Sequence, residues 1–136
     1  MAERAFQGPR ITYNAAVLPA PGGQLFVYLL RAQTKADEYP LGADVRFLMA
    51  SDGSSIIETH QMHKGLIVNR GGVPPGATVV AGNHSHVLSD VPEDSDVFYV
   101  LTRKPPMSEF VGTQTAIYEV KADGAIRVVE KMKKRK

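Results

Sequence analysis

The spacing of apolar residues predicts a chain built mainly from short strands. Apolar runs and alternating apolar positions, bounded by turn residues, are typical of strands. They occur at residues 11–13, 44–50, 56–60, 66–68 and 77–81. Two further runs, residues 115–120 and 126–129, flank the turn Ala122-Asp123-Gly124 and predict a β-hairpin near the C-terminus.

One segment in the N-terminal part favours a helix. Between residues 24 and 36, apolar side chains recur at helical spacing, which predicts a helix over this range. The side chains in question are Leu25, Tyr28, Leu29 and Ala32. The continuous apolar run at 25–30 is equally consistent with a buried strand, and we favour the helix.

A second helix is predicted over residues 95–103, with Ser95 or Asp94 near its N-cap. The β-branched residues in this segment argue weakly against a helix. Two helices and a mixed or antiparallel sheet predict an α+β fold.

Length and composition indicate one soluble domain. A chain of 136 residues with 43% hydrophobic and 22% charged residues is typical of a single globular domain with its own core. We expect a loop-rich segment at 1–23, the domain at 24–130 and a disordered basic tail at 131–136. The net charge of +2 is too small to indicate nucleic-acid binding. The absence of cysteine excludes disulfides and thiolate metal sites.

No targeting segment is evident in the sequence. The N-terminus lacks the apolar central region of a signal peptide. The longest apolar run, at 25–30, is too short to span a bilayer. We therefore expect a cytoplasmic protein without membrane partners, while export without a cleavable signal stays open.

The candidate chemistry lies in His84-Ser85-His86 and in Asp96, ten residues further on. Residues i and i+2 of a strand point to the same face, so the two imidazoles can converge on one ion. Two histidines and one carboxylate form the ligand set of a catalytic zinc site, which leaves a fourth position open for water. The alternative is that the two histidines are simply exposed at a strand end, that the acidic residues belong to an ordinary loop, and that no metal binds there.

Two choices near this motif depend on weaker signals. Asp94 competes with Asp96 as the third ligand, and we prefer Asp96 because the apolar pair that follows it fits the start of a packed element. His60 and His63 are expected to be exposed or partly packed histidines rather than ligands. Motifs for a phosphate-binding loop or for a serine or cysteine nucleophile are absent.

The spacing of these residues resembles the metal motif of the JAB/MPN/JAMM metalloproteases. In that family a His-x-His pair is followed by a loop with Ser-x-x-Asp, and a glutamate lies upstream. His84, His86 and Asp96 match the three metal ligands, and Glu38 matches the upstream glutamate. The compact JAB-like domains associated with bacterial toxins are the most similar, since they also tend to have Glu-Tyr at this point.

The sequence departs from the family pattern in three places. The interval from His86 to Asp96 is one residue shorter than usual, Val87 replaces a frequent proline, and Glu93 stands where the family has serine. A carboxylate cannot donate the hydrogen bond by which that serine is thought to hold the oxyanion. Ser95 is the candidate to substitute for it.

The resemblance implies a zinc-dependent peptidase or isopeptidase acting on a protein or peptide. Glu38 would then take the proton of the attacking water and pass it to the leaving amine. A second hypothesis is a JAB-like binding or scaffolding module with weak or absent catalysis, for which the short loop and Glu93 are the evidence. A third is a metal-dependent hydrolase of another bond, because the ligand set does not name the substrate.

Overall fold

Two four-stranded sheets and one two-stranded ribbon make up the computed structural model, which describes residues 11–69 and 73–133. The N-terminal sheet is antiparallel, in the order β1-β2-β4-β5. Its strands are β1 (Tyr13–Pro19), β2 (Leu25–Arg31), β4 (Val45–Met49) and β5 (Ile56–Gln61). The short 3₁₀ turn η1 (Pro21–Gly23) connects β1 to β2.

The C-terminal sheet has the order β10-β9-β8-β7. Its strands are β7 (Ala81–Ser85), β8 (Ser108–Gly112), β9 (Ala116–Val120) and β10 (Ile126–Lys131). Strands β7 and β8 run parallel, whereas the other two pairs are antiparallel. The ribbon pairs β3 (Tyr39–Gly42) with β6 (Leu66–Asn69).

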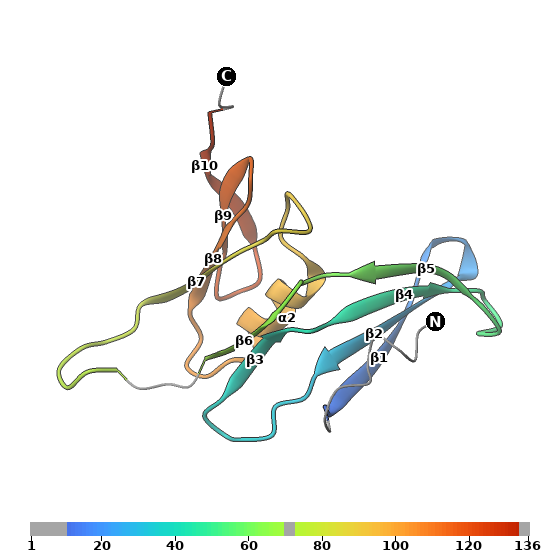
Figure 1. Cartoon of the computed structure of the whole chain (residues 1–136), viewed down its shortest axis with the longest axis horizontal. Helices are drawn as coiled ribbons and strands as arrows, with labels where there is room; N and C mark the ends of the chain where they lie inside the picture. Colours follow the sequence, from blue (N-terminus) through green and yellow to red (C-terminus); the bar gives the residue numbers. More distant parts are fainter. Residues whose placement is uncertain (1–10, 70–72, 134–136) are drawn as a thin grey trace.

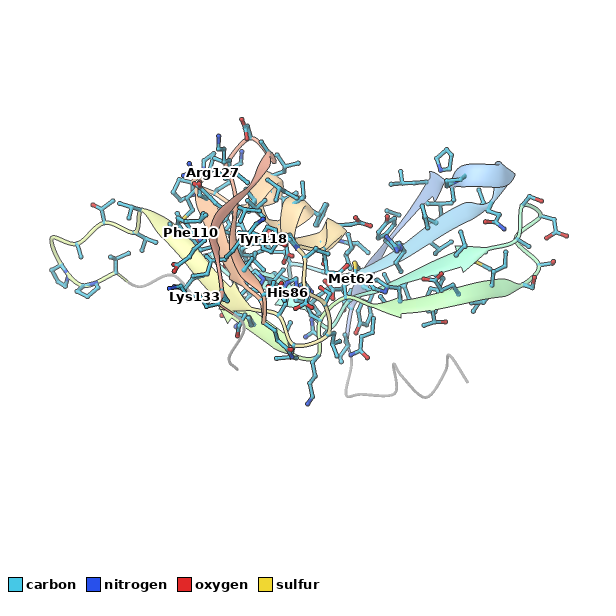
Figure 2. The ribbon with its side chains drawn as sticks, turned by 90° about the horizontal axis from the view of Figure 1, so that it is seen from above. Met62, His86, Phe110, Tyr118, Arg127 and Lys133 are labelled. Atoms are coloured by element: carbon cyan, nitrogen blue, oxygen red, sulfur yellow. The ribbon has the colours of Figure 1, made fainter. Side chains whose placement is uncertain are left out.

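The helix α2 (Asp94–Thr102) connects β7 to β8 and lies between the two sheets (Figure 1). Buried side chains of β3, α2, β8 and β9 form one apolar cluster, made of Leu41, Tyr99, Val100, Val111 and Val120. A second cluster in the N-terminal sheet contains Tyr28, Leu30 and Met62. The apolar core is therefore divided, and Figure 2 shows His86 between the part that holds Met62 and the part that holds Tyr118.

The predicted α+β class is confirmed, but only one of the two predicted helices is found. The described residues contain one α-helix, α2, where the second helix was expected. The helix predicted over residues 24–36 is wrong, because this segment forms β2, which pairs with both β1 and β4. Tyr28 and Leu30 are buried at a spacing of two, which is the period of a strand.

The other elements differ less from the prediction. Strands at 44–50, 56–60 and 66–68 and the C-terminal hairpin are confirmed as β4, β5, β6 and β9–β10. The strand expected at 77–81 instead begins at Ala81, because residues 77–80 are exposed and outside the sheets. Strands β3 and β8 were not predicted. The predicted loop-rich segment 1–23 contains β1.

Several predictions concern residues outside the described ranges. They are the expectation about a signal peptide, which concerns the N-terminal residues 1–10, and the end of the basic tail at 134–136. Within the described ranges, no helix has the length and apolar character needed to cross a membrane.

Candidate metal centre

Strand β7 and helix α2 bring the predicted ligands together. His84 lies in β7 and His86 directly follows it, with the His86 N–H donating to Gly112 O at 2.8 Å. The parallel pairing with β8 thus extends past the end of β7 and holds both imidazoles on one side of the strand. Asp96 lies in the first turn of α2, where its Oδ2 accepts the Glu93 N–H at 2.7 Å.

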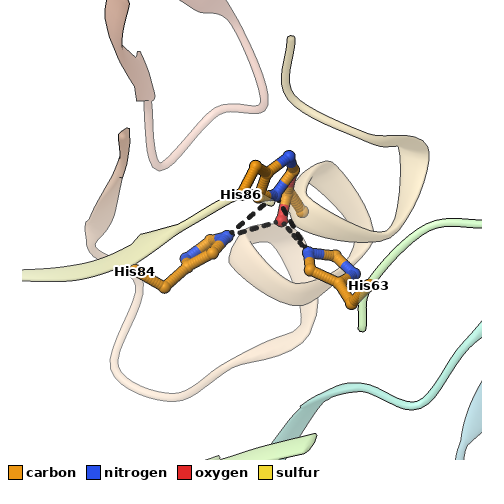
Figure 3. Close-up of side chains that lie close together, drawn as sticks. His63, His84 and His86 are labelled. Carbon is orange, nitrogen blue, oxygen red and sulfur yellow. Dashed lines mark hydrogen bonds and ion pairs between the residues drawn. The ribbon is translucent and has the colours of Figure 1, made fainter. Parts of the chain in front are cut away.

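A third imidazole comes from the other half of the molecule. His63 lies two residues after the end of β5, in the connection to β6, and its ring faces the other three side chains (Figure 3). The sequence prediction missed this residue, which was expected to be exposed or partly packed. His63 is instead 7% exposed, and Met62 beside it is 1% exposed.

Four potential ligand atoms converge at this point. His63 Nε2 lies 3.0 Å from His86 Nε2, and His84 Nε2 lies 3.2 Å from His86 Nε2. The Asp96 carboxylate lies 3.0 to 3.1 Å from all three nitrogens. One ligand atom from each of the four side chains lies within 4.8 Å of the others.

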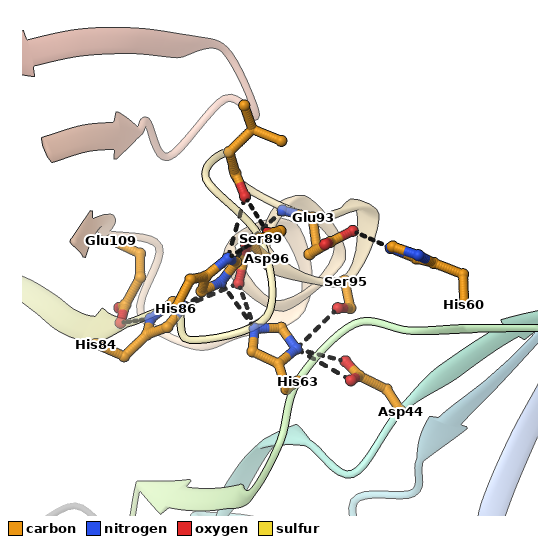
Figure 4. Close-up of polar contacts among 11 residues, drawn as sticks. Asp44, His60, His63, His84, His86, Ser89, Glu93, Ser95, Asp96 and Glu109 are labelled. Atoms are coloured by element: carbon orange, nitrogen blue, oxygen red, sulfur yellow. Dashed lines mark hydrogen bonds and ion pairs between the residues drawn. The ribbon is translucent and has the colours of Figure 1, made fainter. Parts of the chain in front are cut away.

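Each imidazole is oriented by an acceptor at its other nitrogen (Figure 4). His63 Nδ1 lies 3.0 Å from both Asp44 carboxylate oxygens, and His84 Nδ1 lies 2.8 Å from Glu109 Oε1. His86 Nδ1 lies 3.1 Å from Val91 O. An acceptor at Nδ1 places the ring proton there, so the lone pair of Nε2 points to the common centre.

The donor set fits a metal ion. Lone pairs on adjacent Nε2 atoms repel each other unless a cation lies between them. Protons can supply this charge in the metal-free protein, whereas one divalent cation satisfies all four side chains at once. Zinc ligands about 2.0–2.1 Å from the ion lie roughly 3.3–3.4 Å apart in a tetrahedron. The observed contacts of 3.0 to 3.2 Å are close to this spacing.

The site carries one strongly stabilised negative charge. Burial opposes ionisation of Asp96, but hydrogen bonds from the three imidazoles hold the pKa of its carboxyl far below the usual range. Burial also opposes protonation of His63, yet its bonds to Asp44 and Asp96 raise the pKa of its imidazole to about 9. The pKa of His84 is raised despite burial, through Asp96 and Glu109. The centre is therefore built to hold positive charge.

Glu109 extends this network to a buried arginine. Its Oε2 accepts from Arg103 NH1 at 2.9 Å, and both side chains are 4% exposed. Gly82 is packed against this pair, since a Cβ there would overlap the Glu109 carboxylate. The orientation of His84 thus depends on three residues from β7, β8 and the end of α2.

The other predicted site residues lie at the edge of the centre or outside it. The carboxylate of Glu93 pairs with His60 Nε2 at 3.0 Å, and Asp94 accepts from Tyr28 and Arg46. Of the two candidate aspartates, the structure therefore places Asp96 in the cluster. Glu93, rather than Asp94 or Ser95, is the N-cap of α2.

Two residues with proposed catalytic roles remain. Ser95 Oγ lies 3.4 Å from His63 Nδ1, on the side of the ring that faces away from the centre. Glu38 lies before β3 and pairs with Lys35 at 3.3 Å. Among the described residues, Glu38 makes no hydrogen bond or ion pair with any of the four potential ligands.

Comparisons with protein-family models, curated proteins and solved structures found no significant match.

Proposed function

We propose that this protein is a zinc-stabilised binding module in which one zinc ion is held by His63, His84, His86 and Asp96. The observation that carries the proposal is the convergence of three Nε2 atoms, each oriented by its own acceptor, on one buried carboxylate. Imidazole and carboxylate ligands in a tetrahedral arrangement favour zinc over calcium or magnesium, which prefer oxygen ligands.

The ion would act mainly as a cross-link between the two halves. One ligand comes from the connection after β5, and three come from β7 and α2. The N-cap and first turn of α2 also make polar contacts with the N-terminal sheet, such as Asp94 with Arg46 and Glu93 with His60. Because the apolar core is divided into two clusters, a metal ion supplies cohesion that apolar packing does not.

The closed ligand shell favours binding over catalysis. Structural zinc sites have four protein ligands, whereas catalytic sites keep one position for water. The His84, His86 and Asp96 side chains are 0 to 2% exposed, and His63 supplies the fourth ligand. Glu93, where the JAB/MPN/JAMM pattern has serine, is engaged with His60. A JAB-like module without strong catalysis accounts for these features.

A zinc-dependent peptidase or isopeptidase of the JAB/MPN/JAMM type is the second candidate. It is favoured by the position of His63, whose side chain is the most exposed of the four and which lies in the connection from β5 to β6, apart from the other ligands. Without His63, the remaining His84, His86 and Asp96 are the three ligands expected for a catalytic zinc ion. Zinc would then polarise the substrate carbonyl and activate water.

Substitution of His63 separates the two candidates. We expect the wild-type protein to bind one zinc ion, and His63→Ala to bind it at least 100-fold more weakly and to melt at a lower temperature. His60→Ala is the control, because this histidine pairs with Glu93 and not with the cluster, so its loss removes a polar contact between the halves but no ligand and should leave zinc binding unchanged. Both variants should be inactive against a panel of peptides and isopeptides.

Two results would overturn the module. If the wild-type protein takes up no stoichiometric zinc, the proposed metal centre is refuted. If the His63→Ala protein keeps its zinc and cleaves peptides, the binding module is rejected in favour of the peptidase.

A further inference from the structure

A cleft lies between β2, β3 and α2, next to the candidate metal centre. Its volume is about 130 Å³. Tyr39, Leu41 and Phe98 contribute apolar walls, and Asp44 and Ser95, which both contact His63, also line it. The cleft therefore borders the side of His63 that faces away from the other ligands.

Arg31, the last residue of β2, lines the same cleft and has no assigned partner. The other three arginines in the described ranges each pair with a carboxylate: Arg46 with Asp94, Arg103 with Glu109 and Arg127 with Glu119. No hydrogen bond or ion pair within those ranges involves the Arg31 guanidinium. Among the described residues nothing occupies its five donors, which can therefore bind a ligand.

The size and charge of the cleft limit what it can hold. A volume of about 130 Å³ is well below the roughly 300–1,000 Å³ of typical ligand pockets. This is room for one amino-acid residue and too small for a nucleotide or a typical cofactor. Arginine binds carboxylates through paired hydrogen bonds, and the negative charge of Asp44 repels a singly charged carboxylate less than a doubly charged phosphate.

We propose that this cleft binds a carboxylate attached to an apolar group, as in the C-terminal residue of a peptide, with Arg31 holding the carboxylate. The apolar group would pack against Tyr39, Leu41 and Phe98. This inference rests on the proposed function, because it names the class of ligand that the zinc-stabilised module binds.

The test compares N-acetyl-leucine with N-acetyl-leucinamide, which differ in the negative charge. Binding is followed by NMR chemical-shift changes of zinc-loaded protein, and zinc content is measured in the same samples. We expect shifts at the cleft residues and at least tenfold tighter binding of the acid. Arg31→Gln should remove this preference without loss of zinc, and the control Arg127→Gln should keep it.

Three outcomes would overturn the inference: equal binding of acid and amide, a preference that survives Arg31→Gln, or displacement of the acid by an equal concentration of inorganic phosphate. None of these outcomes contradicts the proposed zinc centre as long as the samples contain one zinc ion per chain. Loss of stoichiometric zinc in the wild type would instead refute the proposed function, so the two failures are distinguishable.

Discussion

Among substitutions that leave the four metal ligands unchanged, Glu109→Gln is the one for which the structure predicts the largest loss of stability. Glu109 accepts from His84 Nδ1 through one oxygen and from Arg103 NH1 through the other. A glutamine offers one acceptor and one NH₂ donor to the same two partners. Whichever way the amide is turned, one buried donor faces another donor.

The cost follows from the burial of this network. Arg103 and Glu109 are both 4% exposed, so removal of the negative charge leaves the guanidinium without a counterion in a buried position. Breaking a buried ion pair by removing one partner costs about 3–5 kcal/mol. For a domain of this size, we expect the melting temperature to fall by roughly 10–15 °C.

Thermal unfolding followed by circular dichroism in the presence of a chelator measures this effect apart from zinc. Glu119→Gln is the matched control, because Glu119 pairs with Arg127, whose side chain is 60% exposed. A pair of this kind contributes about 0–1 kcal/mol. A fall of less than about 3 °C for Glu109→Gln, or equal falls for the two variants, would refute the buried network.

The remaining predictions concern the orientation, titration and packing of the centre. Asp44→Asn keeps an acceptor for His63 but removes its charge, so zinc affinity measured by competition with a chelating dye should fall about 10- to 100-fold; an unchanged affinity would contradict this role. In the metal-free protein the pKa of His63 is raised from 6.5 to about 9, so its contribution to stability is fully present below pH 6.5 and lost as the pH rises through about 9. Melting temperatures of chelated protein should therefore decline over this range, and a flat profile would exclude the contribution. Gly82→Ala places a methyl group against Glu109 and should lower both zinc affinity and melting temperature. Gly53→Ala strains an exposed turn with a φ of +71° but has open space around it, so it should leave the zinc affinity unchanged.

The sequence was most informative where the site depends on local geometry. His84 and His86 are two residues apart at a strand end, and Asp96 is in the first turn of the following helix, so short-range rules were enough to relate them. His63 is 21 residues before His84 and reaches the site only through the way the two sheets meet. Burial of Met62 beside it is a tertiary feature that the local pattern does not display.

The errors in the fold have a similar origin. The apolar run in β2 satisfies the helical and the strand pattern equally, and only pairing with β1 and β4 decides between them. Residues 77–80 have the composition of a strand but remain exposed, whereas β7 begins at Ala81, where β8 provides a parallel partner. Pairing between distant segments, which one sequence does not reveal, determined both outcomes.

Zinc K-edge X-ray absorption of protein loaded with one equivalent of zinc tests the central claim most directly. A His₃Asp centre predicts four nitrogen or oxygen ligands at about 2.0–2.1 Å, with the multiple-scattering signal of three imidazoles. In His63→Ala the signal should correspond to two imidazoles in whatever zinc remains bound. A wild-type spectrum with two or fewer imidazoles, or with five or six ligands, would contradict the closed centre.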